Sequence, residues 1–185
     1  MSKYNLKHGE HFSYIENVIS DEEIDRLMNH WENIDIGEVI DYANWDVWSP
    51  KKTYIKHPLR HVEIVGVPVG GIEFLSDRIR SIFSLTLKYD FGIEGPHYFT
   101  KYPTGGFHAE HTDFGVHNGV ERNAVITIQL TDSNDYTGGD LVINGESAPR
   151  TKGTFILYNG NDPHEVTKVT DGIRFSITEC AGEKK

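Results

Sequence analysis

Residues 107–115, FHAEHTDFG, concentrate side chains that can bind a metal ion: two histidines, a glutamate and an aspartate. If the segment is extended, alternate side chains point to the same side. His111 and Asp113 can then direct an imidazole and a carboxylate at one ion. A His-x-Asp pair arises often by chance, so a metal site requires a third ligand from another strand.

His164, in the segment NDPHEV, is the candidate third ligand, because it follows a proline turn and begins a predicted strand. Two histidines and one carboxylate form the facial triad of non-haem Fe(II) oxygenases, which leaves coordination positions open for substrates. The same side chains also bind zinc. A cupin-like isomerase, a zinc hydrolase and a non-catalytic jelly-roll binding module therefore stay open as alternatives at this point.

Arg174 provides a cation for a co-substrate. Oxygen activation at such a triad commonly uses 2-oxoglutarate, and a guanidinium can grip its far carboxylate through two parallel hydrogen bonds, which lysine cannot do. Ser176 and Thr178 share the Arg174 face by alternation, whereas Phe175 and Ile177 face the other way and are expected to pack in the core.

The turn between His164 and Arg174 constrains the fold. If Asp171 and Gly172 closed a two-residue hairpin, Val169 would pair with Arg174, and alternation would place His164 and Arg174 on opposite faces. A single flat hairpin is incompatible with the site. The site therefore predicts two facing sheets, as in a jelly roll.

Two helices are predicted before the site. Ser20 and Glu23 form a capping box at the start of SDEEIDRLMNHWENI. A second helix is predicted within residues 71–92. Both carry apolar residues at helical spacing, which we interpret as faces that support a core: Ile24, Leu27, Met28 and Trp31 in the first, and Ile72, Leu75, Ile79, Ile82 and Phe83 in the second.

From residue 97 the pattern changes to short strands separated by turns. Strands are predicted in HYFTKYP, AVITIQLT, DLVIN, GTFILYN, HEVTKV and RFSITE, and turns in DYTGGD, NGNDP and TDGI. In AVITIQLT, the face of Ile126 and Ile128 should be covered by the helices, and the face of Thr127 and Gln129 should line a cavity. The predicted fold class is α+β, mainly β: a single domain over 1–185, with helical support in 1–92 and a jelly-roll core in 93–182.

The remaining sequence restricts location and partners. The formal net charge is −10, and no long basic run offers a surface for nucleic acid or anionic lipid. We expect no membrane segment and no signal peptide; the single Cys180 suits a reducing compartment, so the cytoplasm is expected. Trp45 and Trp48 lie in an aromatic segment that is interpreted either as a substrate lid or as core packing. The sequence does not predict the oligomeric state.

Three segments together resemble the prolyl 4-hydroxylase-like Fe(II)/2-oxoglutarate oxygenases: YFTKYPTGGFHAEHTDF, ERNAVITIQLTDSNDYTGGDLVI and PHEVTKVTDGIRFSIT. The resemblance covers roughly residues 97–180 and implies a double-stranded β-helix, the cupin-like jelly roll. It implies a dioxygenase that uses Fe(II), 2-oxoglutarate and O₂, with ascorbate as an accessory reductant, and hydroxylates a C–H bond in a prolyl or other residue of a peptide or protein, or in a small molecule.

The resemblance also implies roles for single residues. His111, Asp113 and His164 would bind Fe(II), and Arg174 would bind the distal carboxylate of 2-oxoglutarate. Tyr102, in KYPTGG, matches a tyrosine that contacts the co-substrate. Gln129 stands where relatives often have a tyrosine, which is a departure from the family pattern, although its amide can still donate a hydrogen bond.

Two further histidines neighbour the predicted ligands. His108 precedes His111 by three residues, so a regular strand would turn it away from the His111 face, towards solvent or a supporting role. His117 lies beyond the strand and is expected at the rim of the site.

Overall fold

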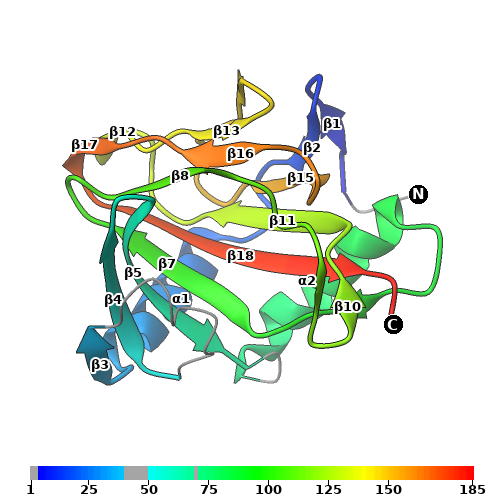
Figure 1. Ribbon diagram of the computed structural model, residues 1–185, viewed down its shortest axis with the longest axis horizontal. Coiled ribbons are helices and arrows are strands. Elements are labelled where there is room, and N and C mark those ends of the chain that lie inside the picture. Colours follow the sequence, from blue (N-terminus) through cyan, green and yellow to red (C-terminus); the bar gives the residue numbers. More distant parts are fainter. Residues whose placement is uncertain (1–3, 40–49, 69–70) are drawn as a thin grey trace.

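The computed structural model describes residues 4–39, 50–68 and 71–185. Most of the described strands belong to one largely antiparallel sheet that curls over itself into a jelly roll, as predicted (Figure 1). The strands of one layer are β2 (Phe12–Ile15), β15 (Phe155–Asn159), β11 (Ala124–Gln129), β18 (Arg174–Gly182), β7 (His97–Tyr102) and β5 (Arg60–Val67). The strands of the facing layer are β8 (Phe107–His111), β16 (His164–Val166), β13 (Leu141–Ile143) and β14 (Glu146–Ser147).

β5 joins the two layers, because it pairs with β7 over Glu63–Val67 and with β8 through Arg60 and His61. The remaining strands are short or lie at the edges: β1 (Lys7–His8), β3 (Ile36–Val39), β4 (Lys52–His57), β6 (Gly92–Ile93), β9 (Val116–His117), β10 (Val120–Glu121), β12 (Tyr136–Gly138) and β17 (Val169–Gly172).

The turn near Gly172 is not a simple hairpin, which agrees with the sequence argument. β17 pairs with β12 in a separate two-stranded sheet and not with β18. The chain therefore passes from β16 to β18 by way of β17, and β16 and β18 come to lie in facing layers. His164 and Arg174 can then face one interior.

The first helix, α1 (Asp21–Glu32), begins at the predicted capping box. The Ser20 side chain accepts a hydrogen bond from the Glu23 backbone N–H, and the Glu23 carboxylate accepts one from the Ser20 N–H. Glu23 also pairs with Arg78 of the second helix, and that interaction lowers the pKa of Glu23 to about 2. One side chain thus fixes both the start of α1 and its contact with α2.

Ser20→Ala is expected to destabilise the fold by about 1 kcal/mol, because it leaves the Glu23 N–H without its cap. Urea unfolding followed by circular dichroism measures the change. Ser81→Ala, at an exposed position inside α2, is the matched control and should change stability by no more than about 0.5 kcal/mol. Equal losses in the two variants would show that the cap contributes nothing.

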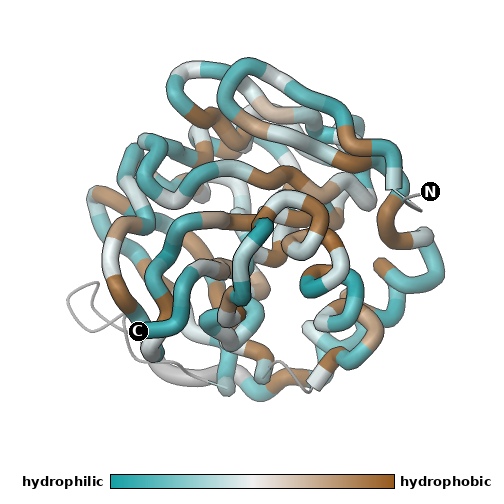
Figure 2. Tube along the Cα trace, turned by 90° about the vertical axis from the view of Figure 1, so that its right-hand side faces the viewer, coloured by the Kyte–Doolittle hydropathy of each residue, from teal (hydrophilic) through white to brown (hydrophobic). Residues whose placement is uncertain are grey.

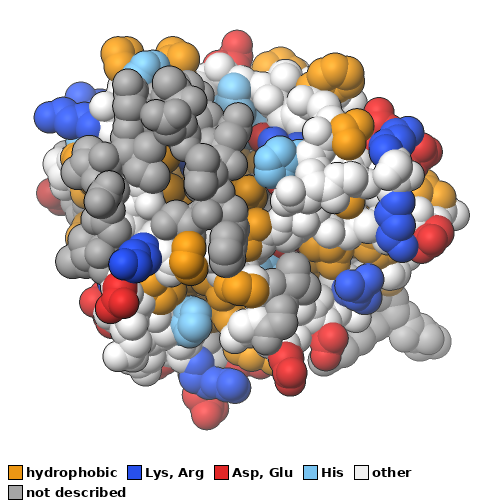
Figure 3. Space-filling view, turned by 60° about the horizontal axis from the view of Figure 1, so that its bottom comes forward, with side chains coloured by type: hydrophobic (Ala, Val, Ile, Leu, Met, Phe, Trp, Pro, Cys, Tyr) orange, Lys and Arg blue, Asp and Glu red, His pale blue; other side chains and the backbone are white. Residues whose placement is uncertain are grey.

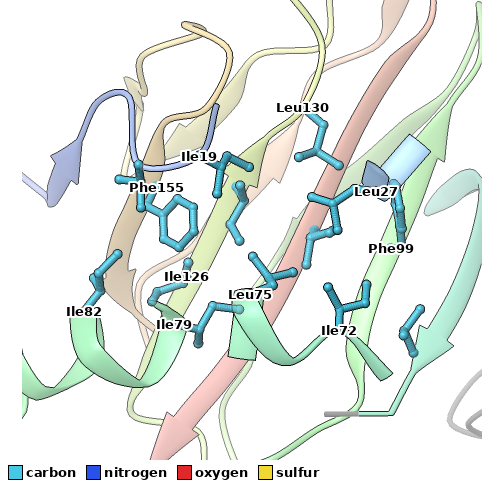
Figure 4. Packing of buried hydrophobic residues seen from close by; sticks show 14 of the residues in the cluster. Ile19, Leu27, Ile72, Leu75, Ile79, Ile82, Phe99, Ile126, Leu130 and Phe155 are labelled. Atoms are coloured by element: carbon cyan, nitrogen blue, oxygen red, sulfur yellow. The ribbon is translucent and has the colours of Figure 1, made fainter. Parts of the chain in front are cut away.

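The second helix, α2 (Glu73–Thr86), packs across one face of the larger layer. Figure 4 shows Leu75, Ile79 and Ile82 directed from α2 towards Ile126 and Phe155 of the sheet. All five predicted inner positions of this helix are buried, as are Ile24, Leu27 and Trp31 of α1. The helices therefore cover the outer face of the larger layer, and its other face is left to the interior between the layers.

β11 follows its predicted alternation. Ile126, Ile128 and Leu130 belong to the core under the helices, whereas Val125 belongs to the second core cluster, between the layers, and Thr127 lines the cavity. Figure 2 shows hydrophobic and hydrophilic residues interspersed along the chain. In β11 the alternation places the polar Thr127 side chain in the cavity, where a polar ligand can meet it.

Two expectations from the sequence need correction. Residues 1–92 are more than helical support, because they contain β1–β5, and β4 and β5 extend the larger layer. Parts of the predicted turns DYTGGD and TDGI form β12 and β17 and pair with each other. Both segments are rich in turn-forming residues, and the positive φ of Gly138 and Gly172 lets a strand and a turn share the same few residues.

The outer surface carries charges of both signs. On the face drawn in Figure 3, acidic and basic side chains are interspersed. In the part of the chain that the structure describes, neither helix is long and apolar enough to cross a bilayer. Trp45 and Trp48, the candidate lid residues, lie outside the described residues.

Candidate functional site

The three predicted metal ligands come together at one end of the smaller layer. His111 ends β8, Asp113 follows it by two residues, and His164 begins β16, where it pairs directly with His111. One ligand atom from each residue lies within 4.8 Å of the others. Asp113 is held by its backbone as well, because its N–H donates to the Gly160 carbonyl at 2.8 Å.

The hydrogen bonds of both imidazoles suit metal binding. Nδ1 of His111 lies 2.8 Å from the Ala109 carbonyl oxygen, and Nδ1 of His164 lies 2.9 Å from the Asp162 carbonyl oxygen. A carbonyl oxygen only accepts, so we infer that each Nδ1 carries a proton and that Nε2 is the ring nitrogen that can bind a metal ion, in exchange for any proton it holds. This is the arrangement in which a histidine binds a metal through Nε2. The donor set therefore fits a divalent transition metal ion.

Burial and the neighbouring charges shift the pKa values of all three candidate ligands. Burial lowers the pKa of His111 to about 4, with the charge of His164 adding to the effect. For His164, burial is outweighed by the hydrogen bond to Asp113, whose Oδ2 lies 3.4 Å from Nε2, and the pKa is raised. For Asp113 the hydrogen bond from His164 and nearby positive charges outweigh burial and lower the pKa. The carboxylate thus attracts positive charge to the position that a metal ion would take.

Arg174 opens β18 and points into the same interior, where it is fully buried. Its Nη2 donates to Oε1 of Gln129 at 2.9 Å, and its Nη1 donates to Ser176 at 3.2 Å. Its Nε is buried with no hydrogen-bond partner among the described residues. A guanidinium that is buried without a carboxylate partner is costly unless an anion joins it. The geometry fits a ligand carboxylate here.

Tyr102 and Gln129 both contact Arg174. Tyr102 lies opposite Arg174 on β7, and the guanidinium sits 5.0 Å from the centre of its ring. Gln129 accepts from Arg174 through its carbonyl oxygen, while its amide nitrogen donates to the Pro149 carbonyl at 3.2 Å. In this arrangement Gln129 holds the arginine and has its amide donor occupied elsewhere.

The ligand cluster and Arg174 line one cavity between the two layers. The larger layer contributes Thr100, Tyr102, Thr127, Arg174, Ser176 and Thr178, and the smaller layer contributes His108, His111, Leu141, His164 and Val166, with Asp113 just beyond β8. Ser176 and Thr178 therefore share the Arg174 face, as alternation predicts, and Ile177 packs in the core on the opposite side.

His108 is in the cavity, contrary to the prediction that it faces away. The register between β16 and β8 shifts between two pairs: His164 lies opposite His111, and Val166 lies opposite His108. Four residues of β8, His108 to His111, thus lie opposite three of β16, His164 to Val166, which is a β-bulge. The bulge turns His108 to the same side as His111, and their ring centres lie 3.8 Å apart. A sequence pattern read as a regular strand cannot show such a shift.

Sequence reasoning also missed Arg122 and Tyr158. Arg122 lines the cavity beside Asp113, and the ring of Tyr158 lies 4.9 Å from that of His164, edge to face. His117, expected at the rim, is half-buried and bound to Glu94. Arg122 and Glu94 carried no recognisable spacing signal, because their partners come from segments far apart in the sequence.

A family model described as the 2OG-Fe(II) oxygenase superfamily matches residues 97–180. A PKHD-type hydroxylase from Picosynechococcus sp. is 35% identical over 80 residues, which covers 41% of this chain and 36% of the relative. A PKHD-type hydroxylase from Idiomarina loihiensis is 31% identical over 81 residues, covering 42% and 37%. The matches thus span little more than a third of these relatives.

Solved structures share the fold over nearly the whole chain. A prolyl-4-hydroxylase from Pseudomonas putida has a TM-score of 0.63 and 18% identity and covers 95% of both chains. The viral collagen prolyl hydroxylase of Paramecium bursaria Chlorella virus-1 has a TM-score of 0.67 and 17% identity, covering 94% of this chain and 96% of that one. The resemblance to prolyl hydroxylase-like 2OG-Fe(II) oxygenases that the sequence indicated is therefore confirmed, over the segment that carries the candidate site.

Proposed function

We propose that this protein is an Fe(II)- and 2-oxoglutarate-dependent dioxygenase that hydroxylates a C–H bond. One observation carries the proposal: the His111–Asp113–His164 cluster and the buried Arg174 line one cavity. A metal site alone would fit several enzymes. A buried guanidinium facing the same cavity supplies the second feature, because it fits the far carboxylate of a dicarboxylic co-substrate.

Each residue has a defined task in this proposal. His111, Asp113 and His164 would hold Fe(II), as three ligands that leave coordination positions for co-substrate and O₂. Arg174 binds the distal carboxylate of 2-oxoglutarate, with Gln129 and Ser176 holding its guanidinium plane. Tyr102 borders the same carboxylate. The bound iron, with 2-oxoglutarate and O₂, supplies the oxidising chemistry, and the protein orients the reactants and excludes water.

The proposed substrate is a residue of a peptide or protein, with proline as the first candidate. Several relatives bear the name PKHD-type hydroxylase, and a prolyl hydroxylase from Trichoplax adhaerens with the same fold, at a TM-score of 0.67 and 18% identity, was solved with a peptide fragment. We further propose a cytoplasmic location, ascorbate as accessory reductant, and one domain in which residues 93–182 form the catalytic core.

The first test is anaerobic. Fe(II) and then 2-oxoglutarate are added to the protein, and the visible spectrum is recorded. Chelation of the co-substrate at a facial triad gives a weak charge-transfer band, and succinate release under air then reports turnover with candidate peptides. Iron binding without the band would reject the co-substrate and favour a cupin-type or zinc enzyme. A protein that binds neither would be a jelly-roll binding module.

Gln129→Glu is expected to weaken 2-oxoglutarate binding by about 10- to 100-fold, because its new carboxylate would pair with Arg174 and compete with the ligand; hydrogen bonds to charged groups are worth about 1.5–3 kcal/mol. The readout is the titration of the charge-transfer band. Gln129→Asn is the matched control: it shortens the amide without adding charge and should have the smaller effect. The reverse order would remove Gln129 from the co-substrate site.

A further inference from the structure

A chain of ion pairs connects the candidate ligand Asp113 to the rim of the cavity. Oδ1 of Asp113 lies 3.9 Å from Nη1 of Arg122. Nε and Nη2 of Arg122 donate to the two carboxylate oxygens of Glu94, the latter at 2.8 Å. Glu94 is bonded in turn to Nδ1 of His117. The Asp113 oxygen near Arg122 is not the one near His164, so the carboxylate has a partner on each side.

Burial makes this arrangement rigid. The side chain of Glu94 is 1% exposed and that of Arg122 is 15% exposed. A carboxylate buried to this extent needs a charged partner, and donation from two guanidinium nitrogens fixes the plane of the arginine. Glu94 therefore determines where the remaining nitrogen, Nη1, points, and Nη1 is the nitrogen that approaches Asp113.

Three separate segments build the contact: Glu94 follows β6, Asp113 follows β8, and Arg122 follows β10. Asp113 itself lies outside regular strand structure, so strand pairing does not fix its side chain. A carboxylate that can rotate about its last bond presents either oxygen, or both, to a metal ion. Holding one oxygen from the side leaves a single oxygen for the ion.

We propose that Arg122, fixed by Glu94, is a positioning residue that orients the Asp113 carboxylate for metal binding. The inference rests on the proposed function, because it takes Asp113 as a metal ligand. Arg122 also lines the cavity, but two of its nitrogens are occupied by Glu94 and the third lies beside Asp113. This geometry assigns it to the metal ligand in preference to the substrate.

The test is a double substitution, Glu94→Gln with Arg122→Gln, which leaves the net charge unchanged. The probe is Mn(II), whose binding is followed by the loss of the electron paramagnetic resonance signal of the free ion. The Kd for Mn(II) is expected to rise about tenfold or more, as for other partners that orient metal ligands. The visible spectrum of bound Co(II) should also change, because it reports how the carboxylate binds.

The matched control is Glu63→Gln with Lys101→Gln, which removes a cross-strand ion pair of 3.1 Å in the same sheet. Its Kd for Mn(II) should stay within about twofold of the wild-type value. A folded Glu94/Arg122 variant that binds Mn(II) as tightly as this control would overturn the inference. If circular dichroism shows that the double variant does not fold, Arg122→Lys is tested in its place. Lysine keeps the positive charge but cannot contact the carboxylates of Glu94 and Asp113 together. An unchanged Kd for Mn(II) in Arg122→Lys would also overturn the inference.

Failure of the inference and failure of the proposed function give different results. If the wild-type protein does not bind Mn(II), or Asp113→Asn binds it as tightly as the wild type, the metal site itself is wrong. If binding depends on Asp113 but not on Arg122, only the positioning role is lost.

Discussion

His164→Ala is expected to abolish Fe(II) binding at the proposed site, with a loss of affinity of more than about 100-fold. Changes to residues that merely orient metal ligands cost about 10–100-fold, and this change removes a ligand outright. His164 is the ligand from the second strand, and its Nε2 lies 3.4 Å from Asp113. Metal titration followed by Mn(II) paramagnetic resonance measures the loss, and succinate formation should disappear with it.

His8→Ala is the control for this experiment. His8 is exposed and lies on β1, at the far edge of the path of paired strands from β16. Its removal should leave metal affinity and unfolding temperature near the wild-type values. If His164→Ala still bound one metal ion per protein, the ion would lie elsewhere. The proposed oxygenase function would then be rejected.

Arg174→Lys is expected to weaken 2-oxoglutarate binding strongly while metal binding is retained. Lysine keeps the positive charge but cannot offer two parallel donors. Loss of one partner of a buried charged pair costs about 2–5 kcal/mol, which corresponds to about 30- to 5,000-fold in affinity. The charge-transfer titration gives the co-substrate affinity, and Mn(II) binding gives the metal affinity in the same variant.

Arg150→Lys is the matched control, because Arg150 also sits over a tyrosine ring, 4.2 Å from the centre of Tyr136, outside the cavity. Its co-substrate affinity should stay near the wild-type value. Equal affinity for 2-oxoglutarate in Arg174→Lys and Arg150→Lys would show that the co-substrate carboxylate is bound by another group.

Local pattern was sufficient to predict the elements nearest the site. Alternation in AVITIQLT and RFSITE correctly separated core residues such as Ile126 and Ile177 from cavity residues such as Thr127 and Ser176. The capping box placed the start of α1 at the correct residue. In each case the signal and the structure depend on neighbours within one strand or one helical turn.

The features that were missed depend on partners distant in the sequence. His108 was placed on the wrong face because the bulge that turns it inward is defined by the pairing of β8 with β16. β5 was not predicted, and its place in the sheet depends on pairing with β4, β7 and β8. Arg122 is held in the site by hydrogen bonds to Glu94, which is 28 residues away in the sequence.

The double pairing of β5 joins the two layers of the jelly roll along one side of the cavity. Because β5 is hydrogen-bonded to β7 and to β8, it fixes how the two layers sit relative to each other along that side. Arg174 belongs to the larger layer, and His111 and His164 belong to the smaller layer. A small dicarboxylate bound by Arg174 at one end and by a metal ion at the other would connect the two layers. Ligand binding in the cavity would therefore stabilise the jelly roll against unfolding.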